Sequence, residues 1–361
     1  MALKVFERYL AREIYASTAL VLVAFLMLFA FFDLIGELRD LGRGGYQLEN
    51  VVAFVVLTIP GRIYELSPIV VLIGTMYAMT ALARHSEITV LRASGLSTGE
   101  FLVTLGRIGA VFVVLTLVVG EFVAPQSERA AQQLRLKAMS SMVAQEFRSG
   151  LWVKDERSFV NVRNVQPDTR LREVRIYEFD TEYRLAAIND AETGDFVAPD
   201  HWRLGSVTRT LFDANGQRSH VEQLPELMWK SALSPDILSV LLVVPEKMSV
   251  VKLYQYIQHL EDNQQKTDRY VIALWKKLVY PLTSLVMMFL ALPFGFLHIR
   301  GGAVSVRVFT GIMLGIGFHM MNGLFSNLGV INNWTPFLSA VTPGAVFLLG
   351  AGGMLWWVEK R

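Results

Sequence analysis

The sequence predicts an α-helical membrane protein with six transmembrane helices and an inserted all-β domain. The 361-residue chain is 53% apolar and has a mean hydropathy of +0.39, which is not typical of a soluble protein. Six apolar runs reach the length of about 20 residues that a helix needs to cross the hydrocarbon layer. Most of the charged side chains fall between residues 126 and 270. That stretch is therefore predicted to be a water-exposed insertion.

The six apolar runs share a length close to one bilayer crossing and few charges. They are Ile14–Ile35, Ile63–Ala83, Phe101–Val123, Leu278–Leu297, Val308–Leu328 and Pro336–Val358. Pro60 and Pro68 predict a kink in the second run, with Val51–Ile59 as an apolar lead-in. Three runs precede the insertion and three follow it. The predicted domains are thus residues 1–125, 126–270 and 271–361.

The basic side chains in short flanking segments predict the orientation of the helices. Those at the N-terminus, between the second and third runs, between the fourth and fifth runs and at the C-terminus are Lys4, Arg8, Arg12, Arg84, Arg92, Arg300, Arg307, Lys360 and Arg361. The opposite short loops hold only Arg39 and Arg43. By the positive-inside rule, both termini are predicted to be cytoplasmic and the insertion to be external.

The insertion is predicted to be rich in β-strands. Short runs with alternating apolar residues recur at Phe159–Val165, Val174–Phe179, Leu185–Ala191 and Trp202–Leu211. Turn residues separate them at Pro167-Asp168, Asp180–Glu182 and Ala214–Gly216. This alternation is typical of half-buried strands and favours a small sandwich or an open barrel.

Helical patterns flank the predicted strands. Ala130, Leu134, Ala138 and Met142 continue the third run outward at helical spacing. After the strands, Tyr256, Ile257 and Leu260 lie on one face of a short amphipathic helix that we expect at the outer interface.

Several kinds of chemistry are excluded by missing motifs. The P-loop pattern needs a Gly-Lys pair and a common zinc-protease site needs H-E-x-x-H, and the chain contains neither. With no cysteine, thiolate catalysis and Cys-ligated zinc are excluded, and His201 and His220 alone make a poor metal site. A net charge of +2 does not indicate a nucleic-acid partner. We therefore expect no catalytic residue, no metal and no cofactor on this chain, and ATP must be used by a partner.

The pentapeptide Gly95–Gly99 matches the G-x-S-x-G pattern of a hydrolase nucleophile elbow. It follows a predicted helix rather than a strand, and no β/α unit lies beside it. We therefore interpret it as a glycine-capped helix end followed by a turn.

Basic residues gather near the predicted outer ends of the helices. A functional interpretation makes them a rim that holds an anionic lipid headgroup, since arginine can bind phosphate oxygens through two parallel hydrogen bonds. The alternative is that each side chain only extends to the interfacial headgroups. The residues concerned are Arg39, Arg62 and Arg135, with Arg43, Lys276 and Lys277 as additional members. An apolar face of the first helix, consisting of Phe25, Leu28, Phe32 and Ile35, is a candidate wall for acyl chains or a plain lipid and helix contact.

The predicted cytoplasmic loop between the second and third runs has a helical pattern over about residues 84–98. Its side chains Glu87, Ile88, Leu91 and Arg92 make it a candidate docking surface for an ATPase subunit. The equally weighted alternative is a simple turn between two helices.

Three segments resemble one family of membrane permeases. Residues 84–95, with the sequence RHSEITVLRASG, resemble the segment that links helices two and three in the LptF/LptG permeases. Residues 120–128 (GEFVAPQSE) are similar to that family's exit from helix three, and residues 150–155 (GLWVKD) to the opening of its external domain. The latter two segments resemble the LptG branch more than the LptF branch.

The resemblance implies a lipopolysaccharide exporter of the ABC type in the bacterial inner membrane. Its implied partners are LptF as the second permease, two copies of the ATPase LptB, and LptC, and it implies a β-jellyroll for the external domain. Glu87 matches the acidic position of the family's coupling helix, and Arg39 and Arg135 match basic positions near its outer cavity. Arg62 is offset by one from a family lysine, and Asp33 stands where relatives carry a basic residue.

Two other classes of function remain as rivals. A lipid-modifying enzyme would need paired carboxylates or a His cluster at one membrane depth, and the sequence contains neither. A scaffold that anchors periplasmic partners would keep the β-domain but would not need the cytoplasmic docking segment.

Overall fold

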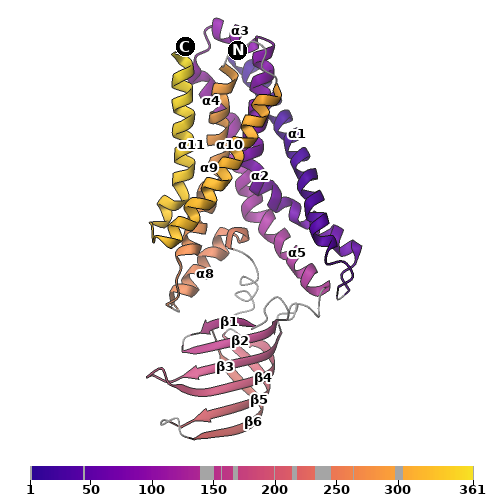
Figure 1. The fold of residues 1–361 in the computed structure, drawn as a ribbon, viewed down its shortest axis with the longest axis vertical. Coiled ribbons are helices and arrows are strands. Elements are labelled where there is room, and N and C mark those ends of the chain that lie inside the picture. Colours follow the sequence, from indigo (N-terminus) through magenta and orange to yellow (C-terminus); the bar gives the residue numbers. More distant parts are fainter. Residues whose placement is uncertain are drawn as a thin grey trace.

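The computed structural model has a bundle of long helices at one end and a β-sheet at the other (Figure 1). It describes residues 2–43, 45–138, 150–155, 157–165, 170–198, 200–213, 218–231, 245–262, 264–296 and 304–360. Both chain termini lie at the end of the bundle farthest from the sheet. We call this the terminal end and the opposite end of the bundle the sheet end.

Three helical spans precede the sheet. They comprise α1 (Ala2–Leu38), α2 (Leu48–Arg84) and a continuous rod made of α4 (Thr98–Val118), a π-helical turn (Val119–Val123) and α5 (Ala124–Ala138). The short helix α3 (Glu87–Ala93) joins α2 to α4 at the terminal end (Figure 1). The predicted outward continuation of the third span is confirmed as α5, and its residue Met142 lies outside the described residues.

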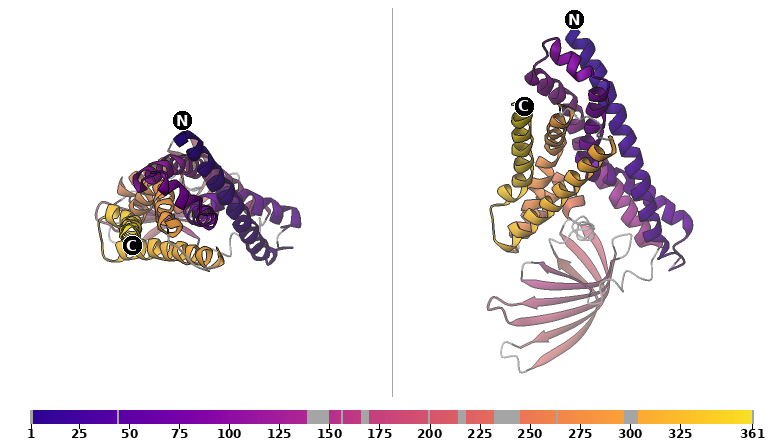
Figure 2. Two further views of the ribbon diagram at one scale, coloured as in Figure 1. Left: turned by 90° about the horizontal axis from the view of Figure 1, so that it is seen from above. Right: turned by 45° about the horizontal axis from the view of Figure 1, so that its top comes forward.

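Three further spans follow the sheet and return the chain to the terminal end. They are α9 (Asp268–Phe296), α10 (Val304–Ile331) and α11 (Pro336–Glu359). Figure 2 shows α1 and α2 diverging from α10 and α11. All six predicted spans are confirmed as helices long and apolar enough to cross a membrane, although Leu297, the last residue of the fourth, is outside the described part.

The second span is longer than the sequence pattern predicts. The helix begins at Leu48 and runs through both Pro60 and Pro68, so Val51–Ile59 is part of it rather than a separate lead-in. Each proline removes one helical hydrogen bond, and neighbouring helices can supply replacement partners in a membrane bundle. Close to Pro68, the Tyr280 hydroxyl of α9 donates to the carbonyl of Glu65 at 2.6 Å, which joins α9 to this turn of α2.

The bundle core joins both halves of the chain. Fully buried side chains of α1 and α2, such as Leu10 and Met79, pack with Phe101 of α4 and Leu292 of α9. Because residues so far apart in the sequence share one core, the first three spans and the last three form a single packed unit.

The inserted domain is a six-stranded antiparallel sheet in sequential order. Its strands are β1 (Leu151–Asp155), β2 (Ser158–Val165), β3 (Leu171–Phe179), β4 (Leu185–Ala198), β5 (His201–Phe212) and β6 (Ser219–Lys230). The all-β insertion and its four predicted strands are confirmed. Among the described strands each pairs only with its sequence neighbours, which differs from the two packed sheets of a sandwich and from a jellyroll's crossed connections. The turns predicted at Pro167-Asp168 and Ala214–Gly216 lie outside the described residues.

One face of the sheet carries its core. Alternate residues of consecutive strands, including Val160, Ile176, Trp202 and Leu204, are fully buried there. Period-two alternation places these side chains on the same face. After the sheet, the described chain resumes with a short 3-10 turn (Pro245–Lys247) and α8 (Val250–Asp262). The predicted apolar face of α8, with Tyr256, Ile257 and Leu260, is confirmed as buried.

Candidate functional site

Arg62 lies in the sheet-end half of α2, 14 residues after the helix begins at Leu48, and two carboxylates bind it. Its Nε and Nη2 atoms donate to the two oxygens of Asp33 on α1, at 3.0 and 2.7 Å, and Nη1 donates to Glu65 Oε2 at 3.1 Å. The Arg62 guanidinium also lies over the ring of Phe29, 5.4 Å from its centroid. The predicted headgroup ligand is therefore already engaged in a half-buried ion pair between α1 and α2.

Arg135 on α5 forms a second ion pair with the end of α1. Its Nη2 atom donates to Asp40 Oδ2 at 2.9 Å, and its Nε atom lies 3.8 Å from Glu37 Oε2. Arg43 also binds Asp40, at 2.5 Å. The hydroxyl of the buried Tyr46 donates to Glu37 at 3.0 Å, and burial together with this bond raises the pKa of Tyr46, which keeps the phenol protonated.

These contacts give the basic residues of the predicted rim carboxylate partners. We call the seven residues the α1 ion-pair cluster, which consists of Asp33, Glu37, Asp40, Arg43, Arg62, Glu65 and Arg135. Asp33 and Glu37 lie one turn apart on α1, and Asp40 follows two residues past its end. The spacing of these carboxylates is visible in the sequence, but it does not show which helices carry their basic partners. Arg39 lies just past α1 and is exposed.

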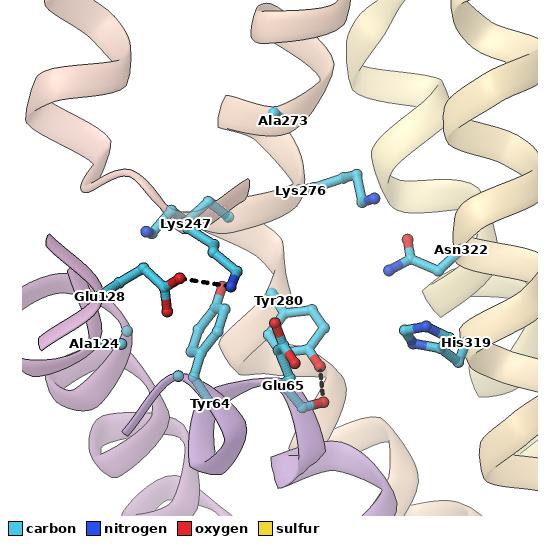
Figure 3. Close-up of a pocket in the computed structure, with 13 residues that line it drawn as sticks. Tyr64, Glu65, Ala124, Glu128, Lys247, Ala273, Lys276, Tyr280, His319 and Asn322 are labelled. Carbon is cyan, nitrogen blue, oxygen red and sulfur yellow. Dashed lines mark hydrogen bonds and ion pairs between the residues drawn. The ribbon is translucent and has the colours of Figure 1, made fainter. Parts of the chain in front are cut away.

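Lys276 and Lys277 of α9 line a cavity rather than a rim. The cavity has a volume of 240 Å³ and lies between α2, the third span, α9 and α10 (Figure 3). Lys277 is buried, donates to the carbonyl of Met248, and its ammonium lies 5.8 Å from the centre of the Tyr64 ring. Figure 3 shows the Lys276 side chain directed toward Asn322 and His319 of α10.

The same region holds charged residues that the sequence reasoning did not identify. Glu128 of α5 is almost fully buried and binds Lys247 at 2.7 Å, while Glu121 accepts a hydrogen bond from the backbone N–H of Val250 at 2.9 Å. Together with the bond from Lys277 to Met248, these contacts hold the segment 247–250, where the chain returns from the sheet. We call the three side chains Glu121, Glu128 and Lys277 the return clamp.

A π-helical turn positions the clamp. Val119–Val123 interrupts the third span, and π-helical turns of this kind are frequent at functional sites. Within it, Gly120 packs so tightly against the Tyr64 ring that an added Cβ would lie 2.4 Å from a ring carbon. This close approach lets Glu121 reach the N-terminus of α8.

The predicted apolar face of α1 is only partly covered. Leu28, Phe32 and Ile35 are 49%, 57% and 42% exposed, whereas Phe25 is half-buried and stacks on Phe29. An exposed apolar face on a membrane helix suits contact with lipid or with a partner helix. These residues stay candidates for an acyl-chain wall.

The predicted docking segment of about residues 84–98 contains a shorter helix than expected, α3 (Glu87–Ala93). The helix ends at Ala93, and Gly95, two residues later, has a φ of +98°. Ser97 then caps α4 through a capping box with Glu100. The interpretation of Gly95–Gly99 as a helix end and turn is therefore confirmed.

The four candidate residues of α3 have different surroundings. Ile88 is buried in the bundle core and Leu91 packs against it, so these two side chains fix α3 to the bundle. Glu87 accepts a hydrogen bond from the Tyr9 hydroxyl at 3.4 Å, and Arg92 is exposed with its guanidinium 5.0 Å from the centre of the Phe296 ring. The outward surface also includes Val90, which is 65% exposed.

Comparison with known proteins assigns the family. Residues 8–358 match the family described as lipopolysaccharide export system permease LptF/LptG. The chain belongs to the LptF/LptG family. Over 359 residues it is 30% identical to the "Lipopolysaccharide export system permease protein LptG" of Escherichia coli strain K12, covering 99% of this chain and 98% of the relative. It is 29% identical to the protein of the same name from Haemophilus influenzae, with 98% of each chain covered.

Membership of the LptF/LptG family agrees with the architecture. The match extends over both helical halves and the inserted sheet, so the whole fold is shared rather than one module. The six apolar helices and the family together make this chain a multi-pass inner-membrane permease component.

Proposed function

We propose that this chain is the LptG-type permease subunit that extracts lipopolysaccharide from the outer leaflet of the inner membrane. The observation that carries the proposal is similarity along nearly the whole chain to relatives that are both named LptG. The sequence segments at residues 120–128 and 150–155 favour the same branch. The extracted lipid would then pass to a periplasmic bridge toward the outer membrane.

In the proposed topology, the terminal end faces the cytoplasm and the sheet lies in the periplasm. The distribution of Lys and Arg in the short flanks supports this orientation. It can be tested by labelling single cysteines, because the chain contains none of its own. A cysteine at Ser86 should be labelled only from the cytoplasm and one at Asn215 only from the periplasm, and the reverse pattern would contradict the topology.

The proposed assembly contains LptF, two copies of the ATPase LptB, and LptC. Since the sequence lacks a P-loop, work must reach this chain through contacts at the terminal end. The outward surface of α3, with Glu87, Val90 and Arg92, is the proposed docking surface for the ATPase, and Ile88 and Leu91 transmit its movement to the core.

The proposed substrate site lies at the sheet end of the bundle. Phosphates of the lipid A headgroup would bind Arg39, Arg62 and Arg135, with Arg43, Lys276 and Lys277 as further cations. Acyl chains would contact the exposed apolar face of α1, formed by Phe25, Leu28, Phe32 and Ile35. Closure of the assembly would then expel the lipid toward the sheet.

Genetic replacement tests the proposed subunit identity. The gene should restore growth to cells depleted of LptG, and the purified chain should retain LptF and the ATPase. If the gene instead restores growth to cells depleted of LptF, the chain belongs to the LptF branch. A chain that inserts into the membrane but retains no ATPase would favour a scaffold.

A further inference from the structure

The arginine best placed for a headgroup is already bound in the geometry that a phosphate would use. Two parallel hydrogen bonds join the Arg62 guanidinium to both oxygens of Asp33, at 3.0 and 2.7 Å. A guanidinium binds carboxylates and phosphates through the same paired geometry. Asp33 therefore occupies the positions that two phosphate oxygens would take on Arg62.

The charge balance of the α1 ion-pair cluster is a second reason why a phosphate must compete with Asp33. In the described structure, its four carboxylates face three guanidinium groups. With Arg39, which is next to Asp40 in the chain, the charges balance, so the cluster as a whole does not attract a phosphorylated headgroup. A phosphate can take the paired geometry on the Nε and Nη2 edge of Arg62 only if it displaces Asp33.

We propose that Asp33 competes with the substrate for Arg62 and so selects phosphate monoesters over the phosphodiesters of ordinary membrane lipids. This inference rests on the proposed function. A phosphate monoester carries about −1.5 to −2 charge at pH 7, more than the carboxylate that it must replace. A phosphodiester carries about as much charge as Asp33 itself and gains little from the exchange. The competing carboxylate therefore penalises the wrong lipids, which surround the site in large excess.

The surroundings of the pair suit such an exchange. Arg62 is held in place from the other sides by Glu65 and by the ring of Phe29, so it keeps its position when Asp33 leaves. Asp33 lies five residues before the end of α1 at Leu38, so a carboxylate released from Arg62 can extend toward the headgroup layer.

The exchange also loosens one end of α1. Toward the terminal end, α1 is packed through fully buried side chains such as Leu10 and Ile14, and Thr18 lies against Gly74 of α2. Toward the sheet end, α1 is largely exposed, and the Asp33–Arg62 pair links it to α2. A phosphate that replaces Asp33 removes this link, so substrate binding should weaken the attachment of the sheet-end half of α1, which keeps the contact of Phe29 with Arg62 and the pair of Glu37 with Arg135.

Competition binding on the complete assembled exporter tests the selectivity. The probes are bis-phosphorylated lipid A and phosphatidylglycerol, measured on the parent and on Asp33→Asn, which keeps the side-chain shape but removes the charge. We expect the preference for lipid A over phosphatidylglycerol to fall by at least about tenfold, which corresponds to ~1.4 kcal/mol. The matched control is Glu49→Gln, an exposed carboxylate at the start of α2 that makes no contact with Arg62 in the described structure.

The outcomes separate this proposal from the proposed function. If Arg62→Ala weakens lipid A binding but Asp33→Asn leaves the preference unchanged, the competition is refuted while the headgroup site stands. If Arg62→Ala also leaves lipid A binding unchanged, the headgroup site at Arg62 fails as well. A loss of preference in Glu49→Gln equal to that in Asp33→Asn would show a general charge effect and would also refute the proposal.

A distance measurement tests the movement of α1. Spin labels at Phe31→Cys and Val52→Cys, both at exposed positions, report on the sheet ends of α1 and α2. Lipid A should broaden the distance distribution in the parent, and Asp33→Asn should show the broadened distribution without lipid. A distribution that neither change alters would refute the release of α1.

Discussion

Substitution of Lys247 by methionine should destabilise the junction between the bundle and the sheet. The side chain of its partner Glu128 is 5% exposed, and that of Lys247 is 39% exposed. Breaking a fully buried ion pair costs about 3 to 5 kcal/mol, whereas an exposed pair contributes at most about 1 kcal/mol. Because one partner is buried and the other is partly solvated, we expect Lys247→Met to lower the free energy of unfolding by about 2 kcal/mol. At about 2 to 4 °C per kcal/mol, Tm should fall by about 4 to 8 °C.

The assay is thermal unfolding of the purified exporter in detergent, with Glu128→Gln and the double variant completing a cycle. The double variant should be more stable than the sum of the single effects predicts, since it leaves no buried charge without a counterion. Additive effects, or an unchanged Tm for Lys247→Met, would refute the reasoning that the return clamp depends on this ion pair.

The remaining predictions concern three other sites. Gly120→Ala should lower the free energy of unfolding by about 1 to 3 kcal/mol, and Tm with it, because the new Cβ meets the Tyr64 ring. Gly36→Ala, at a position with open space, should leave Tm unchanged, and equal effects of the two variants would contradict the packing. Burial lowers the pKa of His259 below 6.5, so its neutral form should stabilise the fold above that pH, and stability should fall as pH drops below 6.5. His259→Gln should make Tm depend less on pH. A His259 pKa above 6.5, measured by NMR titration, would contradict the prediction. Glu87→Ala should reduce the ATPase activity that is coupled to export without preventing membrane insertion. If the variant exports at the parental rate, Glu87 is only a surface charge.

Hydropathy was sufficient to predict the six spans and the all-β insertion, because membrane helices and half-buried strands leave strong periodic signals. It did not predict that the described strands form one sheet in sequential order. Strand β6 escaped prediction since Pro225 and several polar residues interrupt its pattern. Among the described strands β6 is an edge strand, where a proline is tolerated. The length of α2 was underestimated for a related reason, as Pro60 suggests a boundary although the helix continues through it.

The sequence predicted which basic residues lie at the candidate site, but not which carboxylates pair with them. The basic residues near the sheet end were found from their sequence positions. Their partners Asp33 and Glu37 lie on another helix, however, and one sequence does not show which helices touch. Lys277 was expected at the interface, but it is buried against Met248 because α9 packs beside the segment returning from the sheet.

Headgroup binding by the assembled exporter tests the central claim most directly. The double variant Arg39→Ala/Arg135→Ala should bind bis-phosphorylated lipid A less well than the parent, since each charge-assisted contact contributes about 1.5 to 3 kcal/mol when partly desolvated. The loss should be smaller for lipid A that lacks its phosphates. Equal binding of phosphorylated lipid A by the parent and the variant would contradict the account and leave these arginines as anchors of the helix ends.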